Sequence, residues 1–176
     1  MNIQNHKSDL QKLNDLDRQR EQRIKYWNER IIPAVSSHFE KVAELDLNLN
    51  FQINDSMFNN ESLILSFGKK PSCYRYNPDC PVNKKAGKSG HIFMEDAYLG
   101  ISLMYSGKIC GWMVKPRIKD LIKNDEDVVN LGVIAQSECN IEWLDNIIRQ
   151  FFKITFEWKS QEGVIFQEVN RNMIGF

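Results

Sequence analysis

The spacing of apolar residues changes its period near residue 45, and this change divides the chain into a helical part and a strand-rich part. From about Ser8 to Glu44, apolar residues recur mostly at three- and four-residue steps, which is the pattern of an amphipathic helix. Beyond Glu44 every second residue is apolar: Leu45, Leu47, Leu49, Phe51 and Ile53. Strict alternation predicts a strand with one buried face and one solvated face.

Pro33 interrupts the helical pattern. A proline costs about 3 kcal/mol in a helix interior but is tolerated in the first helical turn. We therefore expect either a kink at Pro33 or two helices, with Pro33 near the start of the second. Between Asp17 and Arg23 almost every side chain is charged or an amide, so this stretch is either solvated on all sides or meets a partner through polar contacts.

The remaining pattern predicts further strands and one more helix. Four more strands are expected over residues 63–67, 91–105, 108–115 and 128–136. Ser106 and Gly107 form a two-residue turn between two of them. Asn140 then caps a helix with a broad apolar face, which Gly163 is expected to end. Residues 164–169 are expected to add a short last strand.

This order of elements predicts an α+β fold. The expected architecture is an antiparallel meander sheet of about five strands, with a long N-terminal helix and a C-terminal helix packed on one face. We expect a helical segment over residues 1–44 and the sheet with its C-terminal helix over 45–176. A length of 176 residues fits one structural domain.

Composition and the terminal sequence exclude several functional classes. The chain has 23 basic and 23 acidic side chains, so its net charge gives no attraction to nucleic acid or anionic lipid. The first residues are polar, with no apolar signal segment, and no apolar run approaches the length that crosses a bilayer. We expect a soluble, cytoplasmic protein with reduced cysteines, no cofactor and no membrane partner.

The segment over residues 69–91 is unusually basic. Its prolines and glycines predict a long loop, a kind of segment that is usually functional or disordered. Its six basic side chains oppose only Asp79, and cations interleaved with aromatic rings can hold phosphates and stack on unpaired bases. The predicted anion or nucleic-acid site consists of Lys69, Lys70, Tyr74, Arg75, Tyr76, Lys84, Lys85 and Lys88. The alternative is a solvated surface loop.

Metal binding and catalysis find little support. Cys73, Cys80 and His91 are weak zinc candidates, because the gap between the cysteines is wider than in a structural zinc site; we expect no metal. His91 and Glu95 share one side of a strand and are the closest approach to a catalytic pair, although such a pair more often belongs to a surface network. We assign no catalytic residue and favour a non-enzymatic protein, leaving an enzyme open.

The long N-terminal helix carries the first functional hypothesis. About 37 helical residues would run to roughly 55 Å, longer than a globule of this size, which is about 35–40 Å across. Unless the helix bends back at Pro33, part of it projects or pairs with another chain. We hypothesise a protein-interaction or accessory factor, with a homodimer as one form of it, whose contact residues are Arg20, Arg23, Trp27 and Trp158.

The predicted layout resembles that of small α+β proteins that act as chaperones or as immunity and accessory factors, and this resemblance implies a binding module of that kind. The alternative hypothesis is a protein that binds nucleic acid or a phosphate-bearing ligand through the basic segment 69–91.

Overall fold

The computed structural model describes residues 3–46, 48–55, 61–118, 128–165 and 174–175. Helix α1 (Ile3–Tyr26) continues through the π-helical turn η1 (Trp27–Ile31) into α2 (Ile32–Ala43) without an intervening loop. Pro33 lies in the first turn of α2. This agrees with the expected arrangement of two helices in which Pro33 is near the start of the second. The wide turn before it is closed by the bond from the Ile32 N–H to the Trp27 carbonyl.

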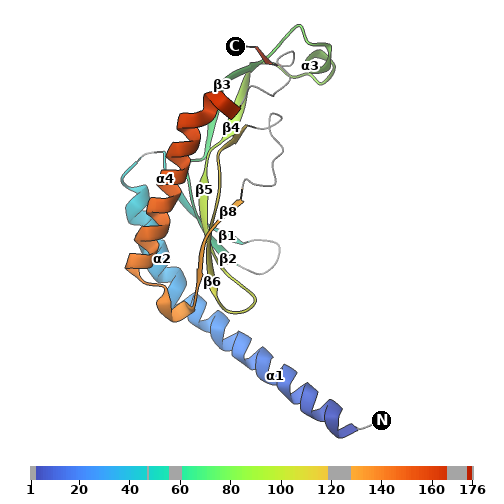
Figure 1. Ribbon diagram of the computed structural model, residues 1–176, viewed down its shortest axis with the longest axis vertical. Coiled ribbons are helices and arrows are strands. Elements are labelled where there is room, and N and C mark those ends of the chain that lie inside the picture. The colour runs from blue at the N-terminus through green and yellow to red at the C-terminus, as the bar shows by residue number, and fades with distance from the viewer. Residues whose placement is uncertain (1–2, 47, 56–60, 119–127, 166–173, 176) are drawn as a thin grey trace.

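A five-stranded antiparallel sheet forms the main body, as predicted. Its strand order is β1-β2-β5-β6-β8. The strands are β1 (Asn50–Asp55), β2 (Glu61–Ser66), β5 (Tyr98–Leu103), β6 (Ile109–Val114) and β8 (Val128–Ile134). Helices α2 and α4 (Ile141–Ile165) cover one face of this sheet (Figure 1). Apolar side chains from both helices and from the covered sheet face form the core, so the α+β prediction is confirmed.

A second sheet extends the first. Its order is β7-β4-β3-β9, and its strands are β3 (Lys69–Tyr76), β4 (His91–Glu95), β7 (Arg117–Ile118) and β9 (Ile174–Gly175). The strand register passes unchanged from one sheet to the other: Ser66 faces Tyr98 and, three residues further along, Lys69 faces Glu95. Backbone hydrogen bonds at residues 67–68 and 96–97 bridge the gap between the sheets. The two sheets are therefore joined by long paired strands that bend.

This bend corrects two predictions. Residues 91–105 do not form one strand, because Asp96 and Ala97 are both buried at the bend and the covered side changes there: Ile92 is buried, whereas Phe93 is 47% exposed. Residues 69–90 are not one loop either. They comprise strand β3 and the short helix α3 (Pro81–Lys85). Proline and glycine content alone therefore misled the loop prediction, since β3 pairs with both β4 and β9.

Several boundaries also differ from the sequence-based expectation. Strand β1 begins at Asn50 rather than Leu45, because a turn around Asp46, whose carboxylate accepts the Asn48 N–H at 2.8 Å, follows α2. The turn after β5 is wider than two residues, since the Met104 N–H donates to the Lys108 carbonyl. Helix α4 runs past Gly163 to Ile165, so Gly163 does not end it.

The start of α4 is as predicted, because the Asn140 side chain accepts the Trp143 N–H at 2.9 Å. The strand expected over residues 164–169 begins inside α4, and its remaining residues lie outside the described part of the chain.

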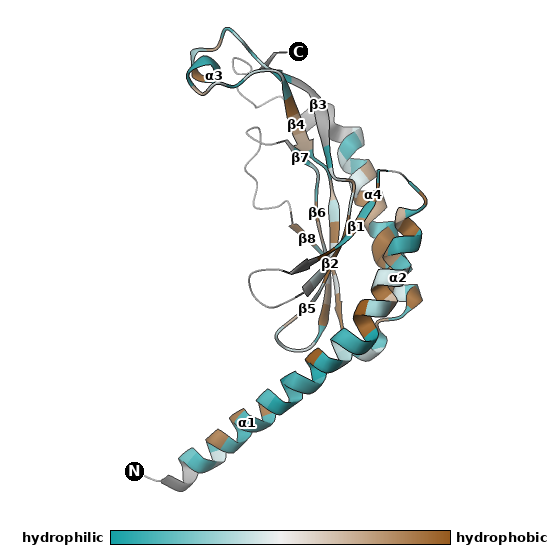
Figure 2. Ribbon diagram, turned by 180° about the vertical axis from the view of Figure 1, so that it is seen from behind, coloured by the Kyte–Doolittle hydropathy of each residue, from teal (hydrophilic) through white to brown (hydrophobic). Residues whose placement is uncertain are grey.

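The molecule is elongated. Helix α1 projects away from the body at one end, and β3, β4 and α3 form the opposite end (Figure 1). Colouring by hydropathy shows that α1 is largely hydrophilic with isolated apolar positions, whereas α2 is markedly more apolar (Figure 2). The two surfaces singled out in the sequence, the long helix and the basic segment, therefore lie far apart.

Candidate functional site

Helix α1 is the most exposed element that the structure describes. Every residue from His6 to Gln22 is exposed. Three leucines of this segment are more than half exposed: Leu10 at 60%, Leu13 at 58% and Leu16 at 56%. Leucines usually lie inside a folded domain, so three of them on one projecting helix define a surface, called here the leucine stripe.

The leucine stripe continues the helix face that packs on the body. Leu10, Asp17 and Ile24 follow one another at seven-residue steps, as do Leu13, Arg20 and Trp27. Such steps keep side chains on one face of a helix. Ile31 and Trp27 are buried in the core. The same face is therefore covered by the sheet at its C-terminal end and uncovered beyond the edge of the body.

Two predicted contact residues bind the chain's own β5–β6 hairpin. The Arg20 guanidinium lies 4.7 Å from the centre of the Tyr105 ring, and Arg23 donates to the Ser106 carbonyl at 3.0 Å. Gly107 has a positive φ of 79°, and a side chain there would collide with Arg23. These contacts hold the base of α1 against the hairpin.

Gln136 completes this attachment. Its side-chain amide donates to the carbonyls of Arg23 and Gly107, at 3.2 and 3.0 Å. Neither Gln136 nor Tyr105 was a predicted site residue. The predicted hairpin was the one sequence signal for Tyr105, because it places residues 104–108 at an end of the sheet. No sequence signal indicated the role of Gln136.

The two predicted tryptophans are placed differently from one another. Trp27 is 2% exposed in the core, and its buried Nε1 has no hydrogen-bond partner among the described residues. Trp158 is half-buried near the end of α4, far from α1. The structure therefore does not bring Trp158 together with Arg20 and Arg23 in one surface.

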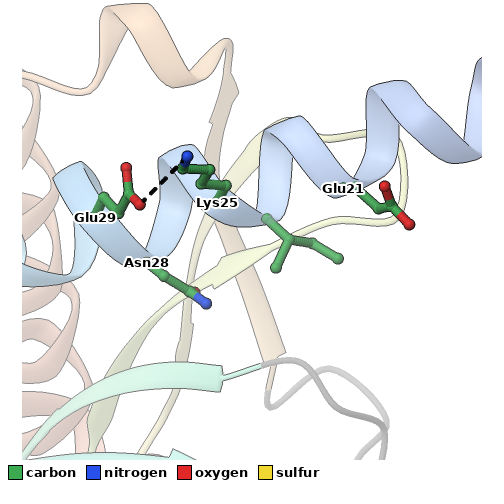
Figure 3. A pocket seen from close by; sticks show the side chains of 5 residues that line it. Glu21, Lys25, Asn28 and Glu29 are labelled. Atoms are coloured by element: carbon green, nitrogen blue, oxygen red, sulfur yellow. Dashed lines mark ion pairs between the residues drawn. The ribbon is translucent and has the colours of Figure 1, made fainter.

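A hollow lies beside the leucine stripe at the base of α1. It is lined by Glu21, Ile24, Lys25, Asn28 and Glu29. Lys25 and Glu29 form an exposed ion pair at 3.9 Å along one rim (Figure 3). Ile24 is 39% exposed and lies in line with Leu10, whereas the other four lining residues are charged or polar.

The basic segment folds into a knob at the other end of the molecule. Its centre is Asn83, which is fully buried. The side-chain amide of Asn83 donates to the backbone carbonyl of Asn77 at 3.0 Å. The backbone carbonyl of Asn83 accepts the Lys88 N–H at 2.8 Å. The Asn77 side chain accepts the Asp79 N–H at 2.9 Å. This segment, residues 77–90, is called the basic knob below.

The structure brings only some of the predicted basic residues together. The Lys88 ammonium lies 5.4 Å from the centre of the Tyr76 ring, and Lys84 is 4.0 Å from Asp79. Lys85 and Arg75 are exposed. Lys69 lies at the other end of β3, with its ammonium 5.3 Å from the centre of the Phe93 ring. Lys70 and Tyr74 were also predicted to belong to this site, but their side chains are not among those that the structure describes.

The metal and catalytic candidates lie on β3, on β4 and just before α3. Within the described part of the chain, no group of three or more His, Cys, Asp or Glu side chains is placed to hold a metal ion. Cys80 is a free, half-buried thiol and His91 is exposed, while the Cys73 side chain lies outside the described ones. Glu95 accepts a hydrogen bond of 2.6 Å from Arg117.

Comparison with protein-family models, with curated proteins and with solved structures finds no match to this chain. None of the described helices combines the length and the apolar character needed to cross a membrane. The leucine stripe and the basic segment are therefore the two features of the described chain from which a function can be inferred.

Proposed function

We propose that this chain is a non-enzymatic protein-interaction factor that binds its partner through α1. The observation that carries the proposal is the leucine stripe, whose three leucines are each more than half exposed on a helix that projects from the body. Most helical stability in proteins comes from packing an apolar face, and every residue of α1 from His6 to Gln22 is exposed. A partner that covers the stripe supplies that packing.

The surface suits helix-to-helix or helix-in-groove recognition, in which apolar anchors at three- and four-residue steps enter a complementary face. Charged side chains of both signs flank the leucines, among them Lys12 and Asp15. A small accessory factor of the chaperone or immunity kind could present such a helix. We place the protein in the cytoplasm, where its thiols stay reduced.

Affinity capture from the source cells, followed by titration of the identified partner, tests the proposal. The test variant carries Leu10→Glu, Leu13→Glu and Leu16→Glu. Burying one leucine contributes roughly 1.5–3 kcal/mol, so the triple change should weaken binding by at least about tenfold per leucine buried at the interface.

The matched control carries Leu45→Glu and Ile141→Glu, which alter exposed apolar side chains outside both α1 and the basic knob. It should bind as the wild type does. Equal affinity of the wild type and the α1 variant for every captured protein would reject the proposal.

The basic knob supports the alternative function, binding of nucleic acid or a phosphate-bearing ligand. Lys88 beside Tyr76, with Lys84 and Lys85 exposed nearby, combines cations with an aromatic ring. Fluorescence anisotropy with a single-stranded oligonucleotide should then show binding that weakens steeply with salt and is lost in the Lys84→Glu, Lys85→Glu, Lys88→Glu variant. No binding at low salt, or unchanged binding by that variant, rules out this alternative.

A further inference from the structure

The sequence of the exposed part of α1 is complementary to itself when two copies run in opposite directions. In an antiparallel helix pair, each a position of the seven-residue repeat faces a d position of the other helix. His6 and Leu13 occupy d positions, and Leu10 and Asp17 occupy a positions. With the pair centred between Gln11 and Lys12, Leu10 of each copy faces Leu13 of the other. Two leucine layers then lie at the centre of the pair.

Charge favours this direction over the parallel one. In the antiparallel pair, Asp17 of each copy faces His6 of the other, and Lys7 lies next to that histidine. In a parallel pair, Asp17 would face Asp17, and two like charges would meet at the interface. An antiparallel pair has two-fold symmetry, so each favourable contact occurs twice.

The attachment of α1 to the body favours the same direction. The face of the leucine stripe is free only up to Arg20, because Arg20 lies over Tyr105 and Trp27 is buried in the chain's own core. The four layers from His6 to Asp17 fit within this free length. Antiparallel pairing also places the two bodies at opposite ends of the helix pair, whereas parallel pairing would place both against the same end.

We therefore infer that the partner of α1 is a second copy of this chain, bound as an antiparallel pair of α1 helices. This inference rests on the proposed function, since it names the partner of the same leucine stripe. An interface of two short helices is small, so the dissociation constant of the dimer should lie in the micromolar range.

Sedimentation velocity of the full chain from about 1 to about 200 µM tests dimer formation. The mass should rise from 20.6 kDa toward twice that value. The Leu10→Glu, Leu13→Glu variant should stay monomeric at every concentration. The control variant with Leu45→Glu and Ile141→Glu, at exposed residues outside both candidate surfaces, should dimerise as the wild type does. A wild type that remains monomeric, or an α1 variant that dimerises normally, overturns the inference.

Disulfide formation tests the direction of the helices. Chains with Leu10→Cys and chains with Leu13→Cys, distinguished by a mass tag, are mixed and oxidised, and the disulfides are located by peptide mapping. The antiparallel pair should form mainly the mixed disulfide between the two variants. Disulfides between identical variants in preference to the mixed one would indicate a parallel pair and overturn the inference.

The experiments distinguish a failure of partner binding through α1 from a failure of self-association through α1. A monomeric wild type whose captured partner is lost on changing the leucine stripe would remove only the second copy as partner. A monomeric wild type whose captured proteins all bind the α1 variant equally well would remove the proposed function too.

Discussion

The ammonium of Lys159, near the end of α4, donates a hydrogen bond of 2.8 Å to Oδ2 of Asp96, whose side chain is fully buried at the bend between the two sheets. The other oxygen of Asp96 accepts the N–H of Ala97 at 2.8 Å. Lys159 is only partly covered and also lies 5.0 Å from the centre of the Phe67 ring. One ion pair thus ties the last covering helix to the point where the strands change direction.

Removing the cation of this pair should destabilise the fold. Lys159→Met removes this cation from the buried Asp96 carboxylate. The loss of one partner of a buried ion pair costs about 3 kcal/mol. Asp96→Asn should cost less, since an amide oxygen can still accept the Ala97 N–H. Urea unfolding measures both changes.

The control for this prediction is Lys153→Met on the same helix. Its exposed ion pair with Glu157, at 3.9 Å, should contribute under about 0.5 kcal/mol. If Lys153→Met and Lys159→Met lowered the free energy of unfolding equally, the buried pair would have no special role.

Gly107→Ala should destabilise the attachment of α1 to the hairpin. The added methyl group would overlap a carbon of the Arg23 side chain, at a backbone φ of 79°. Gly87→Ala is the matched variant, because Gly87 has a φ of 64° but no atom within 4 Å of the added carbon. Both substitutions carry the backbone cost of roughly 1 kcal/mol, so the excess loss in Gly107→Ala measures the collision. Equal losses, by thermal unfolding, would mean that Arg23 moves aside freely.

Burial raises the pKa of the Cys139 thiol from 9.0 to about 11. At neutral pH this thiol should therefore react roughly a hundredfold more slowly with a thiol reagent than an unperturbed cysteine does, because the thiolate is the reactive form. Mass spectrometry after timed alkylation checks this rate. Rapid labelling of Cys139 in the folded protein would contradict it.

The same thiol should make stability depend on pH in alkali. Between pH 9.0 and about 11 the unfolded chain loses the Cys139 proton while the folded chain keeps it, so the free energy of unfolding falls as the pH rises through this window. Below pH 9.0 the contribution is fully present. Urea unfolding of the wild type and of Cys139→Ala isolates this residue, since the variant should show a shallower fall. Identical slopes would exclude the linkage.

Amide hydrogen exchange should divide the N-terminal helix into two parts. The segment before Arg20 has no packed face in the single chain and should exchange quickly, whereas α2, whose Val35 and Phe39 are fully buried, should be protected. Raising the protein concentration should slow exchange before Arg20 as the α1 helices pair. Exchange in that segment that is independent of concentration would count against self-association.

The sequence predicted the parts of the fold that follow one repeating pattern. The four-residue steps of Trp27, Ile31 and Val35 and the alternation of Leu99, Ile101 and Leu103 in β5 each describe one face of one element. A face that must be buried is visible in the order of residues. The Asn140 cap was equally predictable, because it acts within one helical turn.

The bend and the basic knob could not be predicted in the same way. Ile92 is buried and Phe93 exposed because the strands turn at Asp96. The Asp96 carboxylate is bound by Lys159, which lies 63 residues further along the chain. The knob is centred on a buried asparagine, Asn83, a residue type that usually signals an exposed turn. The length of α1 indicated a projecting helix, but the intramolecular contacts of Arg20 and Arg23 required knowledge of where the hairpin ends.

The long paired strands that run through the bend separate the two candidate surfaces to opposite extremities of a narrow molecule (Figure 1). A ligand held at either extremity would leave the other sterically accessible. If two chains joined back to back through their N-terminal helices, the assembly would carry a lysine-rich knob at each outer tip and could span between two separate targets.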